Sequence, residues 1–82
     1  MVLYFRADWC GPCRQASKVF EELKLSYPNV EFRKIDVDED AETANAYGIR
    51  AIPTMILLKD GRVEARATGA RPARETATIL GL

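Results

Sequence analysis

Two cysteines, Cys10 and Cys13, follow a short apolar run, and their position restricts the possible fold more than any other feature of the chain. The run, Val2–Phe5, is rich in β-formers and is typical of a buried strand. Beyond the second cysteine, apolar residues recur with the spacing of one helix face: Ala16, Val19, Phe20 and Leu23. The cysteine pair is therefore predicted to lie where a strand ends and a helix begins.

The rest of the chain continues this alternation of strands and helices. In chain order, we expect strands at 2–5, 30–37, 54–58 and 63–68, a first helix that begins near Cys10 and runs to about Leu25, and further helices at 41–47 and 73–80. The first two strands are joined through a helix, so they should be parallel with a right-handed connection. The last two are joined by Asp60-Gly61, which favours an antiparallel hairpin. The sequence predicts an α/β domain with a mixed sheet and helices packed against it.

The acidic run before the second helix, from Asp36 to Asp40, has two interpretations. A calcium loop needs a longer and more specific spacing of ligands that ends in Glu. Carboxylates at the positive N-terminal end of a helix stabilise that helix, and Gly48 is placed to end it. We therefore interpret the run as helix capping.

The composition is that of one small globular domain over residues 1–82. With 48% hydrophobic and 29% charged residues, the chain is too apolar to be disordered. Twelve basic and twelve acidic residues give no net charge that would steer the chain to nucleic acid or to an anionic membrane. The longest apolar stretch falls far short of the roughly 20 residues that span a bilayer, and no signal-peptide pattern is visible. We expect a cytoplasmic monomer without membrane or nucleic-acid partners.

The chain contains no histidine, which removes the commonest general base and the commonest metal ligand. Chemistry is therefore expected from the cysteines. A thiol at the start of a helix lies near the positive end of the helix dipole, which lowers its pKa from the ordinary value of about 8.5. We predict that Cys10 attacks a substrate disulfide and that Cys13, which should be less exposed, resolves the mixed disulfide. Pro12 has no backbone N–H, but at an early helical position this N–H would have no partner within the helix, so no hydrogen bond is lost.

Cysteine pairs also serve as metal ligands and as structural bridges. Zinc takes four ligands, and this chain supplies two thiols at most, so a zinc site would need a second copy. A purely structural disulfide across so short a loop would remove little chain entropy. A Cys-x-x-Cys pair between a strand and a helix is instead typical of a redox centre.

Four segments together resemble the thioredoxin family: Ala7-Asp8-Trp9-Cys10-Gly11-Pro12-Cys13, Lys34-Ile35-Asp36-Val37-Asp38, Tyr47-Gly48-Ile49-Arg50-Ala51-Ile52-Pro53-Thr54, and Lys59-Asp60-Gly61. The resemblance extends over nearly the whole chain, but the strand and helix with which the family usually begins are absent. It implies a four-stranded mixed sheet, flanked by three helices, in which the second strand forms one edge and the first, third and fourth strands follow. Charged residues on the edge strand would guard it against pairing with another chain.

The resemblance also implies roles for particular residues. Pro53 matches the family's cis-proline, which lies against the disulfide and leaves the backbone N–H and C=O of Ile52 for an extended substrate. The substrate-binding surface is expected to contain six residues near the cysteines: Trp9, Gly11, Pro12, Ile52, Pro53 and Gly69. No cofactor is implied beyond the redox-active disulfide of Cys10 and Cys13.

The chain departs from the family at two positions near the cysteines. Tyr4 stands where many members have a buried Asp that assists proton transfer at the resolving thiol, and Lys34 matches the usual partner of that Asp. With a pKa near 10, a phenol is a poor base at neutral pH, so we expect Tyr4 and Lys34 to modulate the release of substrate. Arg6 replaces an aromatic residue, which should make the rim of the site more basic.

The expected function is the reduction of protein disulfides, with electrons supplied by a thioredoxin reductase or an equivalent donor. Gly11-Pro12 between the cysteines resembles the linker of reducing thioredoxins more than the linkers of glutaredoxins or disulfide isomerases. Two alternatives stay open. One is a glutathione-linked, glutaredoxin-like oxidoreductase. The other is a partner-binding module on a thioredoxin-like fold in which the thiols are secondary.

Overall fold

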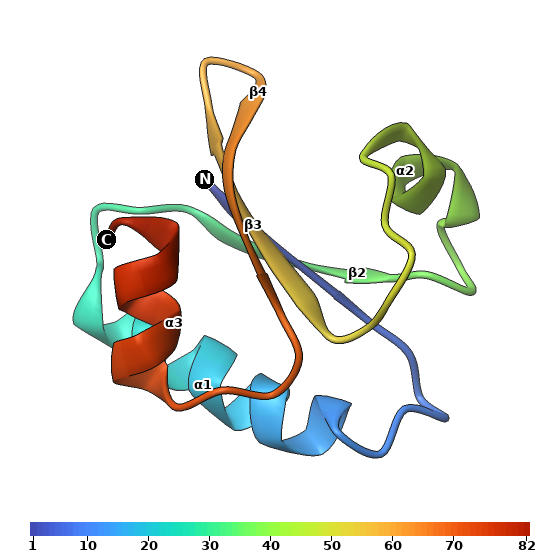
Figure 1. Ribbon diagram of the computed structural model, residues 1–82, viewed down its shortest axis with the longest axis horizontal. Coiled ribbons are helices and arrows are strands. Elements are labelled where there is room, and N and C mark those ends of the chain that lie inside the picture. The colour runs from blue at the N-terminus through green and yellow to red at the C-terminus, as the bar shows by residue number, and fades with distance from the viewer.

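The computed structural model describes residues 1–82 as a four-stranded sheet with helices on both faces (Figure 1). The elements in chain order are β1 Val2–Arg6, α1 Cys13–Ser26, β2 Phe32–Asp36, α2 Ala41–Ala46, β3 Thr54–Lys59, β4 Arg62–Thr68 and α3 Ala73–Leu80. This confirms the predicted order of strands and helices, and the predicted bounds lie within one residue of the observed bounds except at the starts of α1 and β2. No helix is both long and apolar enough to cross a membrane.

The sheet has the strand order β2-β1-β3-β4, as the resemblance implies. β1 runs parallel to β2 and antiparallel to β3, and β3 forms an antiparallel hairpin with β4. At the turn of this hairpin, both Asp60 and Gly61 have positive φ angles, of 53° and 79°. Asp-Gly tolerates this left-handed conformation, which matches the twist of the paired strands, so the predicted turn is confirmed.

The strand predicted at 30–37 is shorter in the structure because its first residues belong to the turn after α1. The Val30 N–H donates to the carbonyl of Tyr27 at 3.0 Å and does not join the sheet. β2 is an edge strand, and two of its five residues, Arg33 and Lys34, are exposed and charged. These two residues are placed as the predicted guards against edge pairing.

Alternation along β1 divides the core between the two faces of the sheet, because successive side chains point to opposite sides. Val2 and Tyr4 pack beneath α1 and α3, whereas Leu3 and Phe5 face α2. These four of the five residues of β1 are buried. The larger cluster, on the α1 and α3 side, contains ten buried residues: Val2, Tyr4, Ala16, Phe20, Leu23, Phe32, Met55, Ala67, Ala77 and Leu80. The central position of β1 therefore fixes the segment that follows it, which carries the cysteines.

The acidic run caps α2 as predicted. The side chain of Asp40 accepts hydrogen bonds from the Thr43 N–H at 3.1 Å and from the Thr43 hydroxyl at 2.7 Å. These bonds favour the ionised carboxylate and lower the pKa of Asp40 below its ordinary value. Gly48, with φ of +64°, follows the end of the helix, as expected for a residue at this position.

Replacing Asp40 by Asn should reduce the loss of stability in acid. Because the pKa of Asp40 is lower in the folded state, the ionised carboxylate stabilises the fold above its unfolded pKa, and this stabilisation disappears as pH falls through the folded pKa. Asn keeps a capping oxygen but does not titrate. Thermal unfolding from neutral pH to about pH 2.5 should show a smaller fall in Tm for Asp40→Asn than for the unaltered chain. An equal fall in Tm for both proteins would contradict the conclusion that the ionised Asp40 carboxylate stabilises the fold.

Candidate active site

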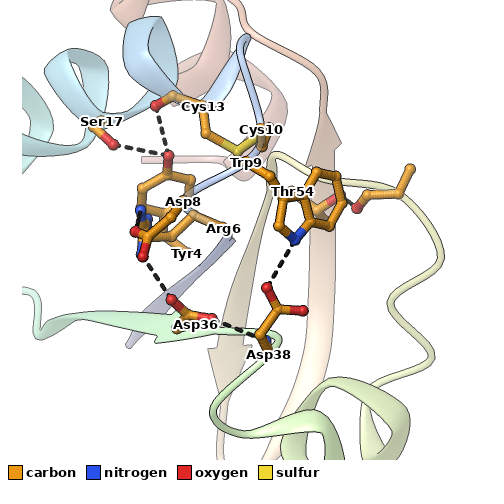
Figure 2. The surroundings of a disulfide bond; sticks show 11 residues. Tyr4, Arg6, Asp8, Trp9, Cys10, Cys13, Ser17, Asp36, Asp38 and Thr54 are labelled. Carbon is orange, nitrogen blue, oxygen red and sulfur yellow. Dashed lines mark hydrogen bonds and ion pairs between the residues drawn. A yellow bond between two sulfur atoms is a disulfide. The ribbon is translucent and has the colours of Figure 1, made fainter.

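The cysteines form a disulfide at the N-terminal end of α1 (Figure 2). Cys13 is the first residue of the helix, and Cys10 lies in the turn that precedes it. The Cys13 N–H donates to the Cys10 carbonyl at 3.2 Å, and Pro12 occupies the N-cap position. The predicted junction is confirmed, although the helix starts only at the second cysteine.

The environment of the disulfide differs between its two ends. Cys10 is 7% exposed and Cys13 is 3% exposed, so the predicted order of accessibility is confirmed. The first turn of α1 contains no acidic residue that would offset the positive end of the helix dipole. That dipole favours negative charge on a sulfur placed before the helix. The arrangement suits a thiol pair that alternates between dithiol and disulfide, with the outer sulfur as the nucleophile.

The loop before β3 lies against the disulfide. The Ile52–Pro53 peptide bond is cis, and the Ile52 side chain packs against the small cluster that contains both cysteines. The Pro53 carbonyl accepts a hydrogen bond from the Gly69 N–H at 2.8 Å, which brings Gly69 to the same loop. The backbone N–H and C=O of Ile52 bond to no other backbone group of the chain. They are free to pair with an extended segment of another molecule.

Trp9 extends the site on the α2 side. The residue is 68% exposed, and its indole N–H donates to Asp38 Oδ2 at 2.7 Å (Figure 2). An open groove of about 210 Å³ runs between this indole and the end of α2. The groove is lined mostly by apolar side chains: Trp9, Val37, Ala41, Ala44, Asn45, Ile49, Arg50, Ala51 and Ile52. Gly11 and Pro12 are also exposed, between the cysteines.

Sequence reasoning did not identify Asp38 as a partner of Trp9, since it assigned Asp38 to the capping run. The two residues are 29 positions apart, and only the parallel pairing of β1 with β2 brings the segments that carry them together. The segment Lys34–Asp38 in the family resemblance was the one signal in the sequence that pointed to this region.

Tyr4 lies beneath Cys13 and makes no hydrogen bond to its sulfur. The hydroxyl donates to the Cys13 carbonyl at 2.9 Å and shares a hydrogen bond with Ser17 Oγ at 3.0 Å. Burial raises the pKa of Tyr4 above its usual value, while the Ser17 hydrogen bond and Arg6 act in the opposite direction. Tyr4 is therefore a neutral phenol at physiological pH, and a fixed hydrogen-bond partner of the helix start.

Lys34 has partners other than the site. Its ammonium group lies 3.6 Å from Glu21 Oε1 and 5.6 Å from the centre of the Phe20 ring. It makes no hydrogen bond or ion pair with Tyr4 or with either cysteine, although Tyr4 and Lys34 are paired in the β1–β2 register. No direct contact with the site therefore supports a modulating role for Lys34.

Arg6 does not make the rim more basic, because its charge is matched by two carboxylates. One guanidinium nitrogen, Nη2, lies 2.6 Å from Asp8 Oδ1, and the other, Nη1, lies 3.0 Å from Asp36 Oδ2. The hydrogen bond to Asp8 is the main cause of a raised pKa for Arg6. The expectation of a basic rim at this position was wrong, since the sequence did not show that the three side chains meet.

No group of three or more Cys, Asp or Glu residues is placed to hold a metal ion. The disulfide and its surroundings are thus the principal chemical feature of the structure.

Comparison with known proteins places this geometry in a family. The family model described as Thioredoxin matches residues 1–80. The thioredoxin of Rhodospirillum rubrum is 46% identical over 69 residues, which cover 83% of this chain and 66% of that protein. Across three such curated relatives, the chain spans 44 to 66% of their length.

Solved structures agree with the sequence comparison. The X-ray structure of Fasciola hepatica thioredoxin matches with a TM-score of 0.83 and 46% identity, covering 95% of this chain and 75% of that chain. Oxidised mitochondrial thioredoxin 3 of Saccharomyces cerevisiae matches with a TM-score of 0.87 and 38% identity, covering 99% and 76%. From its sequence, its fold and the position of its cysteine pair, the chain belongs to the thioredoxin family.

Proposed function

We propose that this chain is a thiol-disulfide oxidoreductase that reduces disulfides in proteins. The observation that carries the proposal is the Cys10–Cys13 disulfide at the start of α1, beside a loop whose Ile52 backbone groups are unpaired. A nucleophilic thiol and a place to hold an extended substrate are thus next to each other. Membership of the thioredoxin family supports the same activity.

In the proposed reaction, the Cys10 thiolate attacks one sulfur of a substrate disulfide. A mixed disulfide forms, and the other substrate sulfur leaves as a thiolate and takes up a proton. Cys13 then loses its proton and attacks the Cys10 sulfur, which releases the second substrate thiol and closes the Cys10–Cys13 disulfide. Two electrons pass from the dithiol to the substrate, and an external dithiol donor must return two electrons to complete the cycle.

Substrate proteins would bind along the surface that surrounds Cys10. An extended segment would pair with the Ile52 backbone, while its side chains contact Trp9, Pro53 and Gly69. Gly11 and Pro12 leave the approach to the Cys10 sulfur free of bulky side chains. Exposed aromatic and aliphatic surface at the rim favours unfolded or extended protein segments over small polar molecules.

We assign the electron donor to a thioredoxin reductase or an equivalent enzyme. Gly11-Pro12 between the cysteines supports a reducing role over glutathione-linked chemistry. A reductant of this kind works where its dithiol form is maintained, so we place the chain in the cytoplasm. It is expected to act as a monomer, because the surface around Cys10 must stay open to substrates.

Reduction of insulin disulfides tests the proposed function. The chain should reduce insulin when supplied with NADPH and thioredoxin reductase, and much more slowly with glutathione and glutathione reductase. Faster turnover with glutathione would replace this proposal by the glutaredoxin-like alternative. No turnover with either donor, together with retained partner binding by a Cys10→Ser, Cys13→Ser double variant, would favour a binding module.

Tyr4→Asp should accelerate the release of substrate at neutral pH. A carboxylate beneath Cys13 can accept the thiol proton, whereas the neutral Tyr4 phenol cannot, and general base catalysis of this kind is worth about a hundredfold or more when well placed. We expect a gain of at least about tenfold, smaller than the hundredfold of a well-placed base. Stopped-flow measurement of mixed-disulfide resolution from about pH 5 to pH 9 would record it.

Tyr4→Phe is the matched control for this variant. It keeps the ring that packs at 5.3 Å from Phe20 and removes only the hydroxyl. Its resolution rate should stay close to that of the unaltered chain. Unchanged rates for Tyr4→Asp across the whole pH range would show that proton transfer at Cys13 does not depend on this position.

A further inference from the structure

Trp9 is the most exposed aromatic residue of the site, yet a single hydrogen bond holds its indole. The acceptor is Asp38 Oδ2, at 2.7 Å, in the loop after β2. Trp9 is 68% exposed, so its indole has little packing to restrain it, and its orientation depends on how firmly Asp38 is held. Trp9 immediately precedes Cys10, so its orientation affects the surface over which a substrate reaches the sulfur.

Asp36 fixes the loop that carries Asp38. Its Oδ1 accepts the backbone N–H groups of Asp38 at 2.8 Å and of Glu39 at 3.3 Å. Its Oδ2 accepts a hydrogen bond from Arg6 Nη1 at 3.0 Å. The Asp36 side chain is only 14% exposed, so this ion pair is less screened by water than a pair on an open surface. Oδ1 of Asp36 therefore holds the loop, and Oδ2 ties the same side chain to Arg6.

Arg6 connects this loop to the segment that carries Trp9. Arg6 and Asp36 are paired in the β1–β2 register, and the Val37 N–H donates to the Arg6 carbonyl at 2.9 Å. The second arm of the guanidinium bonds to Asp8, which precedes Trp9. Figure 2 shows the two segments joined twice, by Arg6 with Asp36 and by Trp9 with Asp38. The planar guanidinium is suited to bridging two carboxylates.

We propose that Arg6 is a positioning residue, which holds Trp9 in place beside Cys10 through Asp36 and Asp38. Arg6 is the one cation that pairs with Asp8 and Asp36. Without it, the half-buried Asp36 would lose its ionic partner while two other carboxylates, Asp8 and Asp38, stay nearby, and like charges at close range repel. The loop would loosen, and the indole would lose its fixed acceptor.

The consequence for catalysis rests on the proposed function. A fixed Trp9 presents one rigid aromatic surface to an extended protein substrate, and rigid contact surfaces bind with less loss of conformational freedom. A small disulfide that reaches Cys10 without touching Trp9 gains nothing from this surface. Arg6 should therefore affect the KM for protein disulfides and leave kcat and the reduction of small disulfides nearly unchanged.

NMR relaxation of the indole N–H tests the positioning directly. Trp9 is the only tryptophan, so the spectrum contains one indole signal. In the unaltered chain its order parameter should approach the rigid value of about 0.85, and in Arg6→Gln it should fall toward the flexible range below about 0.6. Asp38→Ala, which removes the acceptor itself, gives the reference for a free indole. Arg33→Gln is the matched control, because it removes an exposed arginine from β2 that pairs only with Glu31.

Steady-state kinetics test the effect on substrate binding, with insulin and a small aromatic disulfide as the two substrates. Arg6→Gln should raise the KM for insulin about three- to tenfold, which corresponds to the cost of ordering one side chain on binding. Arg33→Gln should change neither substrate's kinetics. If Arg6→Gln does not fold, Arg6→Lys replaces it, since Lys keeps the charge but cannot bridge both carboxylates, and its indole should show intermediate mobility.

An indole order parameter that is unchanged in Arg6→Gln, or lowered equally by Arg33→Gln, would overturn the proposal. So would a fall in kcat on both substrates with no change in KM, because that result indicates general damage to the site. If the unaltered chain reduces no disulfide at all, the proposed function fails, and the NMR comparison still decides whether Arg6 positions Trp9.

Discussion

Cys10→Ser should abolish disulfide reduction, with a loss of at least about a thousandfold, because a hydroxyl at neutral pH cannot replace the attacking thiolate. Cys13→Ser should stop the reaction halfway. Cys10 would still attack the substrate, but no second thiol would release it, so a covalent complex should accumulate. This difference follows from the placement of Cys10 before the helix and of Cys13 within it.

Mass spectrometry of each variant after incubation with oxidised insulin under non-reducing conditions measures the outcome. Cys13→Ser should gain the mass of one whole insulin molecule, because the second interchain disulfide still joins the two insulin chains, and dithiothreitol should remove this added mass. Cys10→Ser should gain none. Covalent trapping by Cys10→Ser, with none by Cys13→Ser, would reverse the assignment of the two thiols.

Phe20→Ala should destabilise the fold by about 3–5 kcal/mol, the usual loss for a buried aromatic residue. A domain of this length is stable by only roughly 4–12 kcal/mol, so much of the chain would be unfolded or close to unfolding. Phe20 is 2% exposed on the inner face of α1, and its ring packs 5.3 Å from that of Tyr4 and 5.7 Å from that of Phe32. The cavity left by Ala would open between the helix and two strands.

Denaturant unfolding of the oxidised chain, followed by circular dichroism, measures this loss. Leu25→Ala is the control, because Leu25 lies on the same helix and is 83% exposed, so its change should stay within about 0.5 kcal/mol. A loss below about 1 kcal/mol for Phe20→Ala would mean that the core can collapse around the missing ring, contrary to the packing described.

Much of the fold follows from local patterns in the sequence. Ala16, Phe20 and Leu23 occupy one helix face because side chains three and four positions apart lie together, and all three are buried against the sheet. The Asp60-Gly61 turn determines a hairpin without reference to the rest of the chain. The cysteine pair, which lies between these local elements, could be placed correctly for the same reason.

The contacts that the sequence did not reveal are side-chain hydrogen bonds and ion pairs between residues far apart in the chain. Arg6 meets Asp36 across 30 positions, and Trp9 meets Asp38 across 29. Many acidic residues were available to each partner, and neither periodicity nor turn chemistry distinguishes among them. The pairing of Lys34 with Glu21 was also not visible in the sequence, since it depends on which face of α1 meets the edge strand.

The reduction potential of the Cys10–Cys13 pair tests the central claim most directly. The oxidised and reduced forms are equilibrated with dithiothreitol or glutathione buffers, and the fraction of free thiols is counted by alkylation. A reductant of protein disulfides should have a potential near the value typical of thioredoxins, about −270 mV, below that of the glutaredoxins. A potential above about −200 mV would contradict this account, because the dithiol would then reduce proteins poorly and the pair would belong to glutathione-linked or oxidising chemistry.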